Sequence, residues 1–70
     1  MFMAPVQSSN IRAIGYDPEK LTLRVSFLSG SAYDYVGVTP DVHGQLMAAP
    51  SVGRFFAQEI KGRYECEQAG

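Results

Sequence analysis

The stretch that decides the fold is "LTLRVSFLSGSAYDYVGV", residues 21–38. Its first part alternates strictly, and one face carries four apolar side chains, those of Leu21, Leu23, Val25 and Phe27. A period of two predicts a half-buried β-strand. Ser29 and Gly30 fit a tight turn, so we expect residues 31–38 to return beside the first strand as a hairpin.

The loop length of this hairpin decides which face Tyr33 and Tyr35 take, because a slip of one residue moves every side chain to the other face. A two-residue loop puts both tyrosines beside Arg24 on the face away from the helices. It also puts Asp34 on the core face, where burying a carboxylate is costly. A three-residue loop reverses the parity and buries the tyrosines. We favour the two-residue loop and therefore an exposed aromatic face.

A further strand precedes this hairpin. The stretch "NIRAIGYD", residues 10–17, is followed by "DPEK", in which Pro18 favours a turn. With that turn, Tyr16 pairs with Leu21 and Ile14 with Leu23. All four side chains are therefore expected in the core.

Two helices are expected after the hairpin. Thr39 is a good N-cap and Pro40 fits the first helical position, so the pattern predicts a short helix over residues 40–49. Ser51 is a second N-cap. From there, apolar residues recur at spacings of three and four, which is typical of one buried helix stripe: Val52, Phe55, Phe56, Ile60 and Tyr64.

The expected fold is thus α+β, with a three-stranded antiparallel β-meander followed by two helices packed on one face. Residues 1–8 are expected to be a flexible lead-in, residues 9–65 a single domain, and residues 66–70 a frayed tail. A chain of 70 residues makes one small domain with a modest core.

Composition limits the function. The net charge is -1 and the pI is about 5.6, whereas domains that bind long nucleic acids are usually basic. A single cysteine, Cys66, excludes an internal disulfide and fits a reducing compartment. No apolar run is long enough for a membrane helix and no signal peptide is visible. We therefore expect a cytoplasmic protein with no membrane association.

The sequence contains no pattern of residues typical of catalysis. His43 is the sole histidine, so a zinc site is not expected, and no serine has an evident base. No glycine-rich phosphate loop is present. Ser51 and Gly53 at the second helix start form a weak candidate for anion binding, although a close packing contact of Gly53 with the sheet or the first helix is the favoured interpretation. We expect neither an enzyme nor a bound cofactor or metal.

The order and spacing of several motifs resemble one known family. The stretches "SSNIRAIGYD", "LTLRVSFLSG", "YDYVGV" and "AAPSVGRFFAQEIKGRY" are similar to the KTSC domain, and together they span roughly residues 6–65. The family's Tyr-x-Tyr matches Tyr33 and Tyr35. Its S-x-G-x-F-F helix start and its final lysine and tyrosine match the following residues: Ser51, Gly53, Phe55, Phe56, Lys61 and Tyr64. Pro50 is not a feature associated with the family.

The resemblance implies a small domain that also occurs at the C-terminus of some lysyl-tRNA synthetases and as a free-standing bacterial or phage protein. No activity is established for the family; RNA binding is suggested by its association with the synthetase. Two hypotheses stay open: a module that binds RNA or a small nucleotide, and a protein-interaction or self-assembly module that forms a homo-oligomer. The candidate binding residues are Tyr33, Tyr35, Arg24, Arg54, Lys61 and Tyr64.

Overall fold

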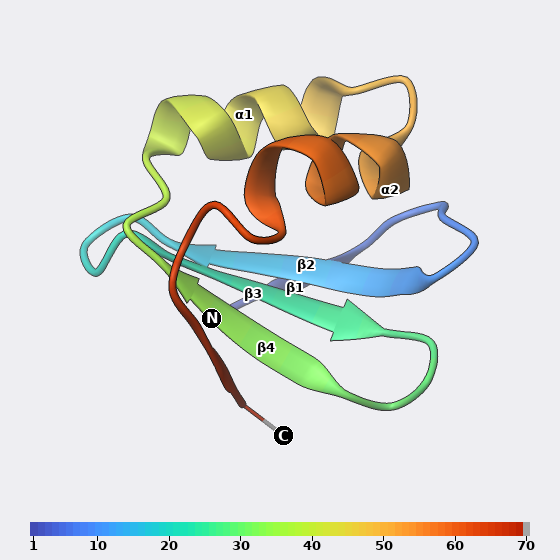
Figure 1. Cartoon of the computed structure of the whole chain (residues 1–70), viewed down its shortest axis with the longest axis horizontal. Helices are drawn as coiled ribbons and strands as arrows, with labels where there is room; N and C mark the ends of the chain where they lie inside the picture. Colours follow the sequence, from blue (N-terminus) through green and yellow to red (C-terminus); the bar gives the residue numbers. More distant parts are fainter. Residues whose placement is uncertain (70) are drawn as a thin grey trace.

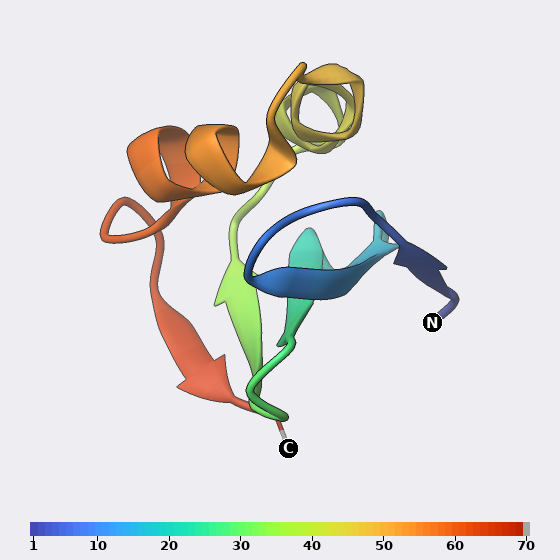
Figure 2. The ribbon, with the colours of Figure 1, turned by 90° about the vertical axis from the view of Figure 1, so that its right-hand side faces the viewer.

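The computed structural model describes residues 1–69. One antiparallel sheet with the strand order β1-β2-β3-β4-β5 carries both helices on the same face, and its other face is uncovered (Figures 1 and 2). The strands are β1 (Met3–Pro5), β2 (Ile11–Asp17), β3 (Thr22–Phe27), β4 (Ala32–Val36) and β5 (Cys66–Gln68). The α+β class is confirmed, but the predicted three-stranded meander is wrong because the sheet has five strands.

The two additional strands are the edges of the sheet. They lie in the segments expected to be a lead-in and a tail, and each is three residues long. β1 pairs with β2 through Met3 opposite Gly15, and β5 pairs with β4 through Cys66 opposite Tyr35. Three residues are too few to show an alternating pattern, so only the pairing with a longer neighbour defines these strands.

The β3–β4 loop contains three residues, Leu28 to Gly30. The Phe27 N–H donates to the Ser31 carbonyl at 2.8 Å and the Gly30 N–H donates to the Phe27 carbonyl at 3.0 Å. Gly30 has a φ of 102°, which a residue with a side chain rarely adopts. This turn followed by a glycine at positive φ is the usual three-residue hairpin connection.

The three-residue loop overturns the predicted register. Tyr35 lies opposite Leu23 and Tyr33 lies opposite Val25, so both tyrosines are on the side of the sheet that the helices cover. The prediction of an exposed aromatic face was therefore wrong. The same shift moves Asp34 out of the core and places it opposite Arg24, which removes the cost of burying its carboxylate.

The β2–β3 loop also differs from the prediction. Tyr16 pairs with Leu23, and Ile14 pairs with Val25, two residues further along than expected. Both keep the predicted core side, but Leu21 does not: it is 37% exposed and has a φ of 51°. The reason is that Leu21 ends a four-residue loop, where its carbonyl accepts hydrogen bonds from the N–H groups of residues 37 and 38.

The helices begin where their caps predict. α1 (Pro40–Ala48) starts after Thr39, whose side chain accepts from the Val42 N–H. α2 (Val52–Phe55) starts after Ser51 and continues as a π-helical turn, η1 (Phe56–Ile60). The second helix is shorter than the apolar stripe suggested, because a turn with Gly62 at a φ of 80° follows it.

The core lies between the sheet and the helices. Its most completely buried side chains come from β2, β3, both helices and the segment before α1: Ile11, Ile14, Leu23, Val25, Val38, Leu46 and Ile60. Tyr16 closes one end, where its ring stacks on His43 of α1 at 4.4 Å and its hydroxyl donates to the Val38 carbonyl. Within residues 1–69, no helix has the length and apolar character needed to cross a membrane.

Candidate functional site

A hollow of about 390 Å³ lies between the second helix and the part of the sheet formed by β4 and β5. We call it the aromatic pocket. Four aromatic rings line it together with small and polar residues, and its complete lining is Asn10, Phe27, Tyr33, Tyr35, Phe56, Ala57, Lys61, Gly62 and Cys66. The pocket thus contains three of the predicted binding residues, namely Tyr33, Tyr35 and Lys61.

The four rings form a continuous chain of edge-to-face contacts. Phe56 is central, with its ring centroid 5.4 Å from that of Tyr35 and 5.6 Å from that of Phe27. Phe27 in turn contacts Tyr33 at 6.1 Å. Such pairs contribute about 0.5–1.5 kcal/mol each beyond the apolar area they bury. The walls of the pocket are therefore fixed by core packing rather than by mobile surface side chains.

The Tyr35 hydroxyl is the most informative polar group of the pocket. Tyr35 is only 5% exposed, yet its hydroxyl forms no hydrogen bond with any of residues 1–69. The hydroxyl is not sealed away from solvent either. Burial raises the pKa of Tyr35, with smaller contributions from Cys66 and Tyr33. The hydroxyl therefore stays protonated at neutral pH and can donate a hydrogen bond into the pocket.

Further polar groups stand around this hydroxyl. Lys61 is exposed and supplies one positive charge. The side-chain oxygen Oδ1 of Asn10 accepts a hydrogen bond from the Ser8 hydroxyl at 3.0 Å, and this bond holds the side-chain amide in place. The Cys66 thiol is free and exposed. An apolar hollow with a few convergent polar groups is the usual form of a small-ligand site.

The π-helical turn positions Lys61 at this pocket. The Lys61 N–H donates to the carbonyl of Phe56, five residues earlier, at 2.9 Å. Residues joined in this way lie on the same side of the helix, whereas in an α-helix they would diverge. π-helical turns are rare and often occur at functional sites. The turn therefore brings a buried aromatic residue and a cation to one hollow.

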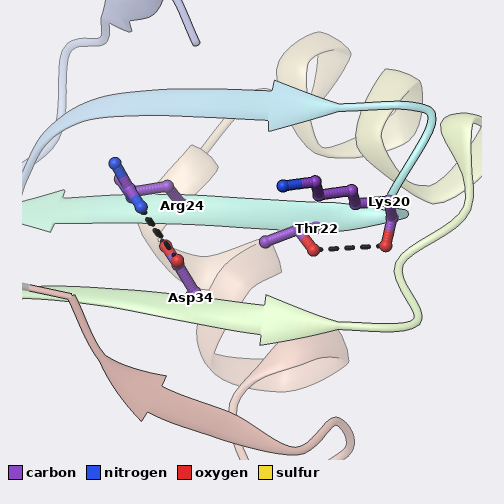
Figure 3. A network of polar contacts seen from close by, with 4 residues as sticks. All are labelled: Lys20, Thr22, Arg24 and Asp34. Carbon is purple, nitrogen blue, oxygen red and sulfur yellow. Dashed lines mark hydrogen bonds and ion pairs between the residues drawn. The ribbon is translucent and has the colours of Figure 1, made fainter.

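Arg24 lies on the open face of the sheet, opposite to the face that carries the aromatic pocket. It therefore does not lie beside the two tyrosines, as the binding prediction required. Figure 3 shows its side chain against Asp34 on the neighbouring strand. Arg24 donates two hydrogen bonds to that carboxylate, with an Nε–Oδ1 distance of 2.7 Å and an Nη2–Oδ2 distance of 2.9 Å. This hydrogen-bonded pair lowers the pKa of Asp34 and raises that of Arg24. The structure therefore separates Arg24 from the tyrosines.

The remaining predicted residues also lie outside the aromatic pocket. Arg54 lines a different shallow hollow, beside Pro50 and Phe55. Tyr64 is half-buried and packs against the core. The candidate residues Arg54 and Lys61 thus lie at two different hollows.

Gly53 makes a close packing contact as expected, but with the segment that precedes β2 and not with the sheet or the first helix. A Cβ atom there would lie 2.9 Å from the Ser8 hydroxyl oxygen and 3.1 Å from the Asn10 side-chain oxygen. Ser51 caps the helix by accepting from the Arg54 N–H. The space beside Gly53 is therefore occupied by protein, and this contact fixes the loop that carries Asn10 to the pocket.

Sequence reasoning missed six lining residues: Asn10, Phe27, Phe56, Ala57, Gly62 and Cys66. Phe27 and Phe56 were assigned to the core, which is correct but incomplete because both also face the pocket. Phe27 shares the alternation of its strand with Leu23 and Val25, which was a usable signal once the correct loop length was known. Cys66 gave no signal, because β5 itself was not predicted.

The titratable residues do not suggest metal chemistry. No cluster of three or more potential metal-ligating residues occurs within residues 1–69. His43 is half-buried against Tyr16, and this burial lowers its pKa.

Known proteins resemble this chain over most of its length. Residues 7–64 match the KTSC domain. An uncharacterised protein of Stutzerimonas stutzeri is 46% identical over 59 residues, which are 84% of this chain and 83% of that protein. A lysine–tRNA ligase of Nostoc punctiforme is 40% identical over 62 residues, which are 89% of this chain but 11% of the ligase.

A solved structure shows the same fold. The crystal structure of a KTSC domain protein from Yersinia pestis aligns with a TM-score of 0.93 at 43% sequence identity, covering 99% of this chain and 97% of that one. The resemblance noted in the sequence is thereby confirmed. With the family match over residues 7–64 and these relatives, the chain belongs to the KTSC domain family.

Proposed function

We propose that this KTSC domain is a non-catalytic binding module and that the aromatic pocket takes a planar aromatic ring with an anionic substituent, as in a nucleotide. The observation that carries the proposal is Tyr35, a pocket residue that is only 5% exposed and whose hydroxyl keeps some access to solvent but has no hydrogen-bond partner within residues 1–69. A ligand acceptor that replaces solvent at this hydroxyl gains a hydrogen bond that the apolar surroundings of the pocket strengthen.

Size and charge support a single nucleotide rather than a long polyanion. A volume of about 390 Å³ is within the range of small-ligand pockets. Lys61 supplies one cation beside the aromatic walls, which suits one phosphate. A chain with a net charge of -1 lacks the basic surface that many phosphates would need.

The ligand could be a free nucleotide or an unpaired nucleotide of RNA. RNA-binding proteins commonly take up splayed bases in aromatic sites, with about 1–3 kcal/mol per stacked base. The relatives named lysine–tRNA ligase contain a similar domain, which supports RNA as the macromolecular candidate and the cytoplasm as the site of action. The same pocket serves either ligand, and a titration distinguishes them.

The test is an NMR titration of the free protein with the four nucleoside monophosphates and with short single-stranded RNA at low salt. We expect saturable shifts at Tyr33, Tyr35, Phe56 and Lys61. Tyr35→Phe should weaken binding about tenfold, the usual value of one hydrogen bond, without changing the fold. Arg24→Ala is the matched control, because it removes a side chain from the opposite face.

Shifts only with RNA would identify the polymer as the ligand, and shifts only with mononucleotides would identify the free ligand. The proposal is wrong if neither probe shifts the pocket at millimolar concentration. It is also wrong if Tyr35→Phe binds as tightly as the unmodified chain.

Self-assembly was the second hypothesis, and an exposed tyrosine face was one of its motives, beside the small core and the near-neutral charge. The observed register removes that motive, because Tyr33 and Tyr35 lie under the helices. Protein interaction has a different physical basis in this fold, the outer edge of β5.

A further inference from the structure

The outer edge of β5 offers free main-chain groups. The Val36 N–H donates to the Glu65 carbonyl at 2.9 Å, and the Ala69 N–H donates to the Ala32 carbonyl at 2.7 Å. Hydrogen-bonded and non-hydrogen-bonded pairs alternate in an antiparallel ladder, so residues 65, 67 and 69 bond to β4. The N–H and C=O groups of Cys66 and Gln68 therefore point outward, and none of them bonds elsewhere within residues 1–69.

The other edge of the sheet, strand β1, is poorly suited to pair with a further strand. β1 ends in Pro5, which has no N–H to donate, and proline on an edge strand discourages further pairing. β5 has no proline, and all three of its residues are exposed. Of the two edges, only β5 can offer both donors and acceptors along its length.

A third hollow, of about 150 Å³, lies directly at this edge. Its lining consists of Val36, Glu65, Cys66 and Glu67. Val36 is 48% exposed and forms an apolar patch on the open face of the sheet. Glu65 and Glu67 share that face, because they alternate with Cys66, which is paired with the inward-facing Tyr35.

The charges of this hollow are not compensated within the described chain. The one ion pair of residues 1–69 joins Arg24 to Asp34 (Figure 3), and it involves neither Glu65 nor Glu67. An apolar floor between two free carboxylates suits the long aliphatic stem and cationic head of a lysine or arginine. The same carboxylates repel a nucleic-acid backbone, so this edge is unsuited to RNA.

We infer that the β5 edge is a docking site for an extended basic peptide segment of a partner protein, which pairs with Cys66 and Gln68 as a sixth strand and places a lysine or arginine against Glu65 and Glu67. Strand addition of this kind draws affinity from the main chain and specificity from alternate side chains. The site goes beyond the proposed function, since it uses the edge and the open face rather than the aromatic pocket. A second copy of this chain is a poor occupant, because its own β5 presents glutamates.

The test uses a capped pentapeptide of alternating threonine and arginine, titrated into the labelled protein at low salt. We expect amide shifts centred on Cys66 and Gln68, and weaker binding as salt screens the charges. The double variant Glu65→Gln/Glu67→Gln should lower the affinity about tenfold, the effect of two exposed ion pairs. Glu59→Gln, which removes an equally exposed charge from η1, should leave the affinity unchanged.

A second variant tests the main chain. Gln68→Pro removes an outward N–H while leaving the hydrogen bonds to β4 intact, so it should abolish the peptide shifts without a change in the spectrum of β4. A peptide with glutamates in place of the arginines should not bind. The inference is overturned if the arginine peptide produces no shifts, if its shifts map to the aromatic pocket, or if binding persists in Gln68→Pro. Tyr35→Phe should leave peptide binding intact, so failure of the pocket proposal and failure of this one are distinguishable.

Discussion

The two faces of the β3–β4 hairpin are stabilised by different interactions, aromatic packing on one face and an ion pair on the other. On the helix side, Tyr35 and Phe27 pack edge-to-face against Phe56, and Tyr33 packs in the same way against Phe27. Tyr35 is only 5% exposed. On the open side, Arg24 and Asp34 form one ion pair whose side chains are 39% and 17% exposed. The first face loses a large buried area when it is disturbed, and the second loses only a partly screened electrostatic contact.

One loop residue determines which side chains belong to each face. With three residues between Phe27 and Ser31, the tyrosines join the core and the charged pair faces solvent. With a two-residue loop, the rings of Tyr33 and Tyr35 would face water and the carboxylate of Asp34 would face the core. The comparison shows that the register of a hairpin follows from the burial it permits, and not only from the residues best suited to a tight turn.

Deleting Ser29 should have the largest effect on the two faces, because it shortens the β3–β4 loop. We expect the deletion to abolish cooperative folding. The shortened loop would have two residues, so each β4 side chain would change face unless the hairpin moved out of register. Urea denaturation followed by circular dichroism measures the result. Ser29→Ala is the control and should change the free energy of unfolding by less than about 0.5 kcal/mol. A deletion variant as stable as the unmodified chain would show that the loop does not control the faces.

Replacing Tyr35 has the next largest effect. Tyr35→Ala removes a buried ring that contacts Phe56, and it should lower the free energy of unfolding by about 3 kcal/mol. Tyr35→Phe keeps the ring and removes only an unpartnered hydroxyl, so we expect a change below about 0.5 kcal/mol. Denaturant titration of both variants provides the comparison. A large loss in Tyr35→Phe would mean that the hydroxyl has a structural partner.

The predictable part of the fold is the part with long local patterns. The alternation of β3, the caps Thr39 and Ser51, and the apolar stripe through Phe56 and Ile60 all correspond to observed elements. These signals are local, and each spans several residues. They predicted the α+β class and the core side of β2 and β3.

The unpredicted part depends on small differences between long-range alternatives. Ser29 and Gly30 suit a two-residue turn, and only the packing of Tyr33 and Tyr35 against the helices selects the longer loop. β5 has no pattern of its own, because it exists through its pairing with β4. Three residues of the aromatic pocket, Tyr33, Tyr35 and Lys61, could therefore be selected from the sequence. Its location on the helix side of the sheet could not be predicted.

The open face should respond least to mutation, and it shows a specific pH dependence. Removing both Arg24 and Asp34 in a double-mutant cycle should give a coupling energy of about 0.5 kcal/mol or less, because solvent screens the pair. The Arg24 hydrogen bonds lower the pKa of Asp34 in the folded chain below its ordinary value of 3.8. The contribution of the Arg24–Asp34 pair to the free energy of unfolding is therefore fully present above pH 3.8. It is lost as the pH falls through the pKa of Asp34 in the folded state.

Unfolding curves of the unmodified chain and Asp34→Asn, collected from pH 7 down to pH 2, isolate this contribution. The stability difference between them should be constant at neutral pH and shrink in acid. Glu67→Gln is the control, since it lies opposite Asp34 but outside the ion pair. A difference that grew in acid would mean that the folded state favours the protonated carboxyl. The open face would then depend on Asp34 as a neutral hydrogen-bonding group and not as the charged partner of Arg24.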